Sequence, residues 1–480
     1  MFIFSYSKIC TSTAGNLAGP LRELLFPERT SRLFGHQLFF LRLVLFAWLS
    51  MVSVSGHTQS SDILDRYIRE ALANSLRIRE AAIQLESKRV EEEWGHRLYL
   101  PELSFGTSYT LAAGGRSISF PVGDLLNPVY STLNKLTQSA AFPSIDNVEE
   151  QFLPNNFYDA RFRVRQPIIR AEIELTQKLQ EVQRTAAEIH IEVLRRELIK
   201  EVKTAYFGYL QAMALLEVFD RNRALLAAQR TVQEGLIRNG KLSAVALDRN
   251  SADVARLEAQ RAQVVVNKEN AAQYFNFLLS RDGTAPIERD SLLAGAIPGI
   301  PENPSPRPEL AQLEAGQSAA ALLVAMEKAK TKPALGAQLD YGSQGFHFDW
   351  GPYALLGISL EIPLWTGGKQ KLQIQRARLE SERLDVSFQQ AQRAFDLEVQ
   401  TTRQRFLGAV KNWESFPVQV EYAQRNYRET LRRYQEGVAG DLELQEAQTQ
   451  WYGIEIQQTV AYYAVLLCFA DLERAMNTSW

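Results

Sequence analysis

The stretch YDARFRVRQ, Tyr158 to Gln166, decides how the rest of this sequence is interpreted. It alternates apolar side chains with mostly charged ones at the two-residue period of a β-strand. Residues 100–110, 335–341 and 358–362 show the same alternation of an apolar and a polar face. Such strands suit either a half-buried sheet in a soluble protein or a membrane barrel with a wet lumen. The strand pattern alone favours the soluble sheet.

The N-terminus changes this balance because it predicts export. Arg42 precedes the apolar run LVLFAWLSMVSV, which ends in small residues around Gly56, a pattern typical of a secretory signal. We expect residues 1–56 to comprise a signal peptide and an N-terminal extension, and a short membrane anchor is the alternative. Cleavage would remove Cys10 and leave Cys468 as the single cysteine, so we expect no intrachain disulfide.

Four strands are too few to close a barrel, and an open sheet edge cannot lie in lipid. If these strands lie in a membrane, several copies of the chain must share one barrel. Two copies would give eight strands, whose interior side chains largely fill the barrel, whereas three would give twelve and leave a channel. Residues 112–156 would form an outward-facing loop.

The arginines of the quoted stretch, Arg161, Arg163 and Arg165, would face the lumen of such a barrel. They either favour anionic cargo or are neutralised by acidic residues of the same face. The candidate acids are Glu102, Asp159, Asp340 and Glu361.

The chain also repeats itself. One helical stripe of apolar or small residues runs through 191–216, and a second runs through 388–413 at a constant offset from the first. Five prolines between Pro298 and Pro308 exclude a helix or a central strand there and predict a linker. The expected organisation is a first repeat at 57–285, a Pro-rich linker at 286–308 and a second repeat at 309–480.

Two very long helices are predicted at about 171–236 and 369–436. Each would span on the order of 100 Å, and its interspersed charges are typical of a solvated coiled coil. Pro417 should kink the second helix. Each helix ends at a glycine turn, QEGLIRNGK in the first and QEGVAGD in the second, after which the chain returns as a new helix. Two such tips at one end of the molecule would form its natural docking face.

With these strand pairs, duplicated hairpins and tips, the sequence resembles the TolC-like outer-membrane efflux proteins. The stretches TAYFGYLQA (204–212) and YQEGVAGDLELQEAQ (434–448) look like signatures of that family. The resemblance implies an α+β membrane protein, a homotrimer with a shared twelve-stranded β-barrel in outer-membrane lipid and a coiled-coil helical domain in the periplasm. It implies the exit duct of a tripartite efflux or type I secretion system. A periplasmic adaptor, or membrane fusion protein, would join it to an inner-membrane transporter.

The resemblance also assigns roles to residues of the two tips. The adaptor would dock on Gly235, Leu236, Gly240, Gly437, Val438, Ala439 and Gly440. Acids after the second turn would line the periplasmic entrance, namely Asp441, Glu443 and Glu446. Glu443 and Glu446 share one helical face, so three copies would ring the entrance with like charge. A solvated helix face is the alternative.

Composition argues against several other functions. A formal net charge of -2 and a pI near 6.3 leave no basic footprint for nucleic acid. The five histidines have no metal-ligand spacing, and the sequence holds no phosphate loop, dinucleotide fingerprint or nucleophile elbow. We therefore expect no metal, cofactor or catalytic site. The alternative function from another class is a soluble periplasmic coiled-coil adaptor or scaffold, which needs the hairpins but no membrane strands.

Overall fold

The computed structural model describes residues 62–290, 297–300 and 304–478. The chain divides into two compact units, Met1–Gln59 and Ser60–Trp480. The expected signal segment at 1–56 lies outside the described residues, as do 291–296 and 301–303 of the expected linker. All described elements belong to the second unit.

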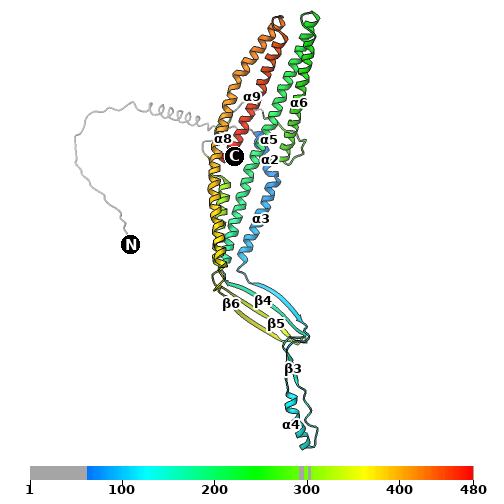
Figure 1. Ribbon diagram of the computed structural model, residues 1–480, viewed down its shortest axis with the longest axis vertical. Helices are drawn as coiled ribbons and strands as arrows, with labels where there is room; N and C mark the ends of the chain where they lie inside the picture. Colours follow the sequence, from blue (N-terminus) through cyan, green and yellow to red (C-terminus); the bar gives the residue numbers. More distant parts are fainter. Residues whose placement is uncertain (1–61, 291–296, 301–303, 479–480) are drawn as a thin grey trace, which may run out of the picture. The chain divides into compact units, whose positions relative to one another are not determined.

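The second unit is built from helices and antiparallel strands (Figure 1). The helices are α2 (Asp62–Asn74), α3 (Leu76–Arg97), α4 (Val122–Thr137), α5 (Ala171–Arg238), α6 (Val245–Leu278), α7 (Pro308–Ala329), α8 (Lys369–Gln435) and α9 (Asp441–Met476). The strands are β1 (Glu102–Thr110), β2 (Ser117–Phe120), β3 (Val148–Gln151), β4 (Phe157–Ile169), β5 (Ala334–Phe346) and β6 (Pro352–Glu361). The four alternating segments are therefore strands, and α5 and α8 are the two long helices, as the sequence predicts.

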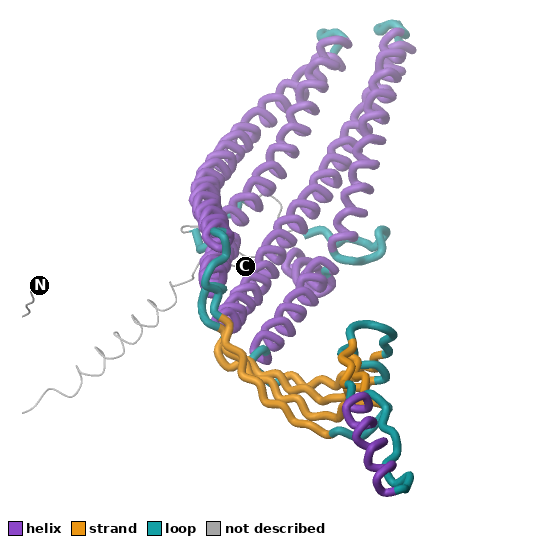
Figure 2. Tube along the Cα trace, turned by 60° about the horizontal axis from the view of Figure 1, so that its bottom comes forward, coloured by secondary structure: helices purple, strands orange, loops and turns teal. Residues whose placement is uncertain are grey.

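The four longer strands form one antiparallel sheet in the order β1-β4-β5-β6, and Figure 2 shows them curving together. In this register, Arg163 of β4 lies opposite Ser104 of β1 on one side and Asp340 of β5 on the other. Paired residues of antiparallel strands point to the same face, so the charged residues of β4 share a face with Asp340. β1 and β6 are the edges, and each has a single hydrogen-bonded neighbour among the described strands.

The long helices build two hairpins. α5 has 68 residues and returns as α6, while α8 has 67 residues and returns as α9. Both hairpins leave the sheet in the same direction, so their tips lie at the end of the second unit that is far from the strands (Figure 1). Pro417 lies inside α8 without ending it, and the expected kink stays a prediction.

None of the helices in the described part of the chain combines the length and the apolar character needed to cross a membrane.

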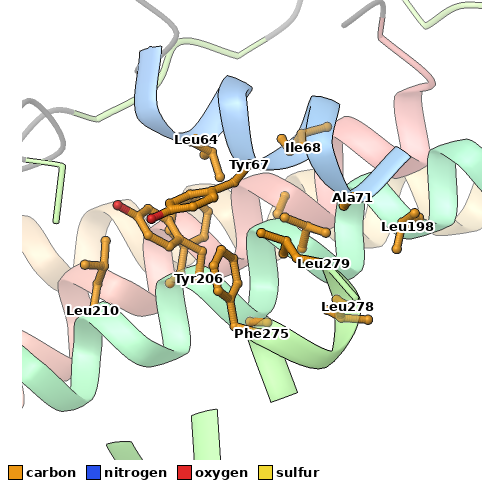
Figure 3. Close-up of a cluster of buried hydrophobic side chains, with 14 of the residues drawn as sticks. Leu64, Tyr67, Ile68, Ala71, Leu198, Tyr206, Leu210, Phe275, Leu278 and Leu279 are labelled. Atoms are coloured by element: carbon orange, nitrogen blue, oxygen red, sulfur yellow. The ribbon is translucent and has the colours of Figure 1, made fainter. Parts of the chain in front are cut away.

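An apolar core holds α2 and the end of α6 against α5 (Figure 3). Tyr67, Tyr206 and Phe275 contact one another at its centre, with ring centroids between 5.1 and 5.9 Å apart. The Tyr206 hydroxyl donates a hydrogen bond to the Glu288 carbonyl at 2.9 Å and accepts one from the Asp290 amide at 3.0 Å. Burial raises the pKa of Tyr206, which keeps this hydroxyl neutral and able to donate.

The segment after β1, which the sequence predicts to be an outward-facing loop, contains regular structure. Residues 112–156 contain the helix α4 and the short hairpin β2–β3, which pairs Ser117 with Gln151 and Phe120 with Val148. α4 could not be predicted from the sequence, because Pro128 lies inside it and proline normally breaks a helix.

Candidate functional site

The two hairpin tips are built on the same backbone motif. In the second tip, Gly437 has φ +79°, its amide bonds to the Tyr434 carbonyl at 3.0 Å, and the Val438 amide bonds to the Arg433 carbonyl at 2.8 Å. Gly240 of the first tip has φ +64° and sits in the same pair of bonds. This is the Schellman cap, which satisfies the last carbonyls of a helix and needs a residue that tolerates a left-handed φ.

This motif identifies the equivalent glycines of the two tips. Gly235 and Leu236 lie within α5, one turn before the cap, so Gly240 is the structural counterpart of Gly437. Sequence spacing cannot tell a cap glycine from a helical one, because only the backbone φ separates them.

The tips also contact each other. Buried residues of the second hairpin form one apolar cluster with partly buried residues of the first, which are Val232, Leu236 and Leu242. Ala439 and Tyr434 lie inside this cluster, whereas Gly437, Val438 and Gly440 stay exposed. Of the expected docking residues, Leu236 and Ala439 therefore hold the tips together, and the exposed ones are available to a partner.

Asp441 lies within this contact. Its carboxylate accepts hydrogen bonds from Nε2 of Gln233 at 2.8 Å and from the Tyr434 hydroxyl at 3.3 Å, and Arg249 lies 4.0 Å away. Its side chain is only 11% exposed, so Asp441 joins the first hairpin to the second within one chain. Sequence reasoning missed Gln233 and Tyr434, because the spacing of residues on one helix carries no sign of its neighbour.

The other two expected entrance acids are more accessible. Glu443 pairs with Arg433 at 2.7 Å on the exposed surface, and Glu446 is exposed.

Burial raises the pKa of Tyr434 to about 12, with the charge of Asp441 as the second cause. The phenol is therefore neutral at physiological pH.

The polar face of the sheet carries a network of paired charges. Arg163 donates two hydrogen bonds to the Asp340 carboxylate, at 2.8 and 2.7 Å. Asp159 accepts from Arg161 at 2.6 Å and from the Tyr353 hydroxyl at 2.9 Å. Of the two expected roles for Arg161 and Arg163, the geometry supports neutralisation by acidic neighbours.

Arg165 and Glu361 do not join this network. Both line a hollow of about 790 Å³ where the sheet meets the helices, together with Glu102, Arg170 and Lys332. Among the described residues, Arg165 and Glu361 have no ion-pair partner within 4.0 Å. Of the four residues expected in the lumen, Arg165 and Glu361 are therefore the two whose charges are unpaired.

The other face of the sheet is apolar and uncovered. Leu103, Phe162 and Leu356 on this face are between 53% and 72% exposed, although each is large and apolar. At the end of the sheet far from the long helices, the Phe348 ring stacks on Tyr109 and Tyr158. Apolar bands bordered by aromatic side chains are typical of strands that face lipid.

Comparisons with known proteins agree with this geometry. The family model for outer membrane efflux proteins matches residues 303–478. The outer-membrane channel OprN is 16% identical, with a TM-score of 0.72 over 87% of this chain and 90% of that chain. The outer membrane protein VceC from Vibrio cholerae is 15% identical, with a TM-score of 0.68 over 87% of this chain and 96% of that one. The CmeC outer membrane channel of Campylobacter jejuni is 15% identical, with a TM-score of 0.70 over 88% and 90% of the two chains. No curated protein matches the chain.

Proposed function

We propose that this chain is an outer membrane efflux protein, as the family-model match over residues 303–478 supports, and that three copies of it form a passive exit duct across the outer membrane. The sheets would lie in the outer membrane and the helical hairpins in the periplasm. The duct would be a channel and not an enzyme. Cargo would enter between the hairpin tips and leave past the loops of the sheet.

One observation carries this proposal: within one chain, the two edge strands of the sheet are unpaired and its apolar face is exposed. β1 and β6 each lack a neighbour on one side within the described chain. An edge with unpaired amides and carbonyls cannot lie in hydrocarbon, where each such group costs several kcal/mol. Pairing β1 of one copy with β6 of the next removes every edge, and three copies give a twelve-stranded barrel wide enough for a channel.

The helices that adjoin these edges carry matching apolar stripes. On α3, which precedes β1, Leu76, Ile83 and Val90 follow one another every seven residues and are exposed. On α8, which follows β6, Leu372, Leu379 and Val386 do the same. A seven-residue repeat is the spacing of a coiled-coil seam. Joining β1 to β6 of a neighbouring copy would bring α3 alongside the neighbour's α8 and cover both stripes.

The exposed tip residues would dock the partners. The tips lie at the end of the second unit opposite the sheet, so they would face the inner membrane when the sheet lies in the outer one. We assign adaptor docking to the exposed tip residues, which are Gly240, Gly437, Val438 and Gly440. An inner-membrane transporter would supply the energy. Glu443 and Glu446 would contribute negative charge at the entrance.

The seam between α3 and α8 provides a direct test. In a Cys468→Ser background, Val90→Cys is combined with Leu379→Cys, and separately with Leu372→Cys to allow for a shift of one heptad. Oxidation in outer-membrane preparations should link three chains into a ring in at least one pair. Because each seam takes one residue from α3 and one from α8, the single variants are matched controls and should stay unlinked.

A second control moves the cysteine around α3. Gln84 is exposed and lies about 100° from Ile83 on the helix, so Gln84→Cys with Leu379→Cys should not link. If both seam pairs stay unlinked and the chain washes off the membrane at alkaline pH, the duct is contradicted in favour of a soluble adaptor or scaffold. The uncovered apolar face of the sheet argues against that alternative, because a soluble protein would expose it to water.

A further inference from the structure

Residues 112–156, called here the loop unit, are held in a fixed shape by α4. Asn127 of α4 brackets Ile145 with two hydrogen bonds, one to its carbonyl at 2.8 Å and one from its amide at 2.8 Å. Asn134, two turns further on, brackets Phe142 in the same way at 2.8 and 3.0 Å. Gly123 lies on the same face, where an added Cβ would be 2.2 Å from the Ile145 carbonyl oxygen. This face of α4 is fully used within the chain.

The opposite face of α4 carries an apolar stripe that one chain leaves exposed. Leu125 is 70% exposed, Val129 51% and Leu136 76%. With Thr132 among them, the stripe follows steps of four, three and four residues, the a/d spacing of a coiled-coil seam. At 3.6 residues per turn, it lies about 180° around the helix from the two bracketing asparagines. The stripe is therefore free to meet a partner.

A lipid surface is a poor match for this stripe. Helices that lie on membranes carry several Lys or Arg residues on their polar face, which anionic lipid attracts. α4 has one basic residue, Lys135, and one acidic residue, Asp124. The loop unit as a whole has two basic residues, Arg116 and Lys135, against four acids, which are Asp124, Asp146, Glu149 and Glu150.

A second copy of the chain is a good match. The loop unit continues from β1 and β4 at the end of the sheet far from the long helices (Figure 1). Closing three sheets into one barrel would hold three loop units around a single mouth. Attachment to one barrel would give each α4 a high local concentration of the other two. A contact between 16-residue helices would then form even if its affinity between separate helices were low.

We propose that the α4 helices of three copies pack on one another through Leu125, Val129 and Leu136 and form a cap over the outer mouth of the duct. The cap restricts the passage of large external solutes into the barrel and must part when cargo leaves. This inference rests on the proposed trimeric barrel, and it adds a homotypic contact outside the membrane.

Cysteine cross-linking in whole outer membranes tests the contact. In the Cys468→Ser background, Val129→Cys should give linked chains with a short bis-maleimide and a linked trimer with a three-armed maleimide. The matched control is Ser131→Cys, which lies on the same exposed helix about 200° away from Val129, and it should not link. Thr132→Cys is a second stripe position with little apolar content to lose, and it should link as Val129→Cys does.

The role of the cap has a separate readout. The double variant Leu125→Asp and Val129→Asp places like charges in the seam, so killing by a large externally added antibiotic such as vancomycin should increase several-fold. Ser131→Asp should leave the killing unchanged. The cap is overturned if Val129→Cys stays unlinked while a Val90/Leu379 or Val90/Leu372 pair links, and the trimeric duct then stands. If every pair stays unlinked and the chain washes off the membrane at alkaline pH, both the cap and the duct are overturned.

Discussion

Gln233 of α5 donates a hydrogen bond from Nε2 to Oδ1 of Asp441 at the start of α9, at 2.8 Å. The bond joins residues 208 positions apart and fixes one hairpin tip to the other. Gln233 is 1% exposed, so the bond is shielded from water. A shielded bond to a charged acceptor is among the stronger single contacts of a fold. The relative position of the tips therefore depends on it.

Gln233→Ala should loosen the tips. It leaves the Asp441 carboxylate with Tyr434 as its remaining close donor, and the loss should cost about 1–3 kcal/mol locally. Hydrogen exchange at the amides of both tips should become faster. Glu234→Ala is the matched control, because Glu234 forms an exposed pair with Arg230 at 3.1 Å and such pairs contribute about 0–1 kcal/mol. Equal exchange in the two variants would contradict the role of Gln233.

Alkaline pH should act on the same contact through Tyr434. Its pKa is raised from 10.0 to about 12, first by burial and then by Asp441. The unfolded tip loses this proton first, so the contribution of Tyr434 to stability is complete below about pH 10 and is lost as the pH rises toward 12. The difference in tyrosinate absorbance between the protein and Tyr434→Phe should titrate near pH 12. A difference centred near pH 10 would show that Tyr434 is not buried in the contact.

The periodic parts of the fold could be predicted from the sequence, because a two-residue or 3.6-residue period is a local property. YDARFRVRQ lies within β4, and the predicted helices at 171–236 and 369–436 end within two residues of α5 and α8. The resemblance to outer-membrane efflux proteins followed from the order of these elements. The sequence also indicated that Asp340 was a candidate to neutralise the arginines.

The remaining features depend on contacts between distant residues. α4 was missed because Gly123 and Pro128 look like helix breakers. Its stabilising hydrogen bonds, from Asn134 and Asn127, reach backbone groups that lie 8 and 18 positions further along the sequence. The hydrogen bond between Asp441 and Gln233 could not be predicted, because Gln233 is on the other hairpin. The equivalence of Gly240 and Gly437 could not be predicted, because backbone φ cannot be read from glycine content.

The charge network of the sheet should tolerate removal of the pair better than removal of one member. Asp340 is 2% exposed, so Arg163→Ala would leave its carboxylate with only weaker partners and should lower the thermal stability of the assembly. Arg163→Met with Asp340→Leu removes both charges and should restore most of that loss. Thermal dissociation of the assembly in detergent measures both variants. A double variant as unstable as the single one would contradict the pairing.

Gly437→Leu should weaken docking of the adaptor. Leucine at φ +79° costs about 1–2 kcal/mol of backbone strain and adds bulk to the exposed tip. Gly437→Ala adds similar strain with little bulk, so the difference between the two variants isolates the docking surface. Pull-down of a periplasmic adaptor from the native host should fall most for Gly437→Leu, with membrane levels unchanged. Gly408→Leu is the control, because Gly408 is an exposed helical glycine with open space around it, and it should leave adaptor capture unchanged. Full adaptor capture by Gly437→Leu would contradict a role for this tip in docking.

The central claim is that one chain supplies too few strands to face lipid alone. Native mass spectrometry of the protein extracted from outer membranes in mild detergent tests it most directly. We expect the mass of three chains, and an electron-microscopy map of that particle should show β1 of each chain paired with β6 of the next. A particle with the mass of one chain, or a map in which the four strands enclose a core of their own, would contradict the account.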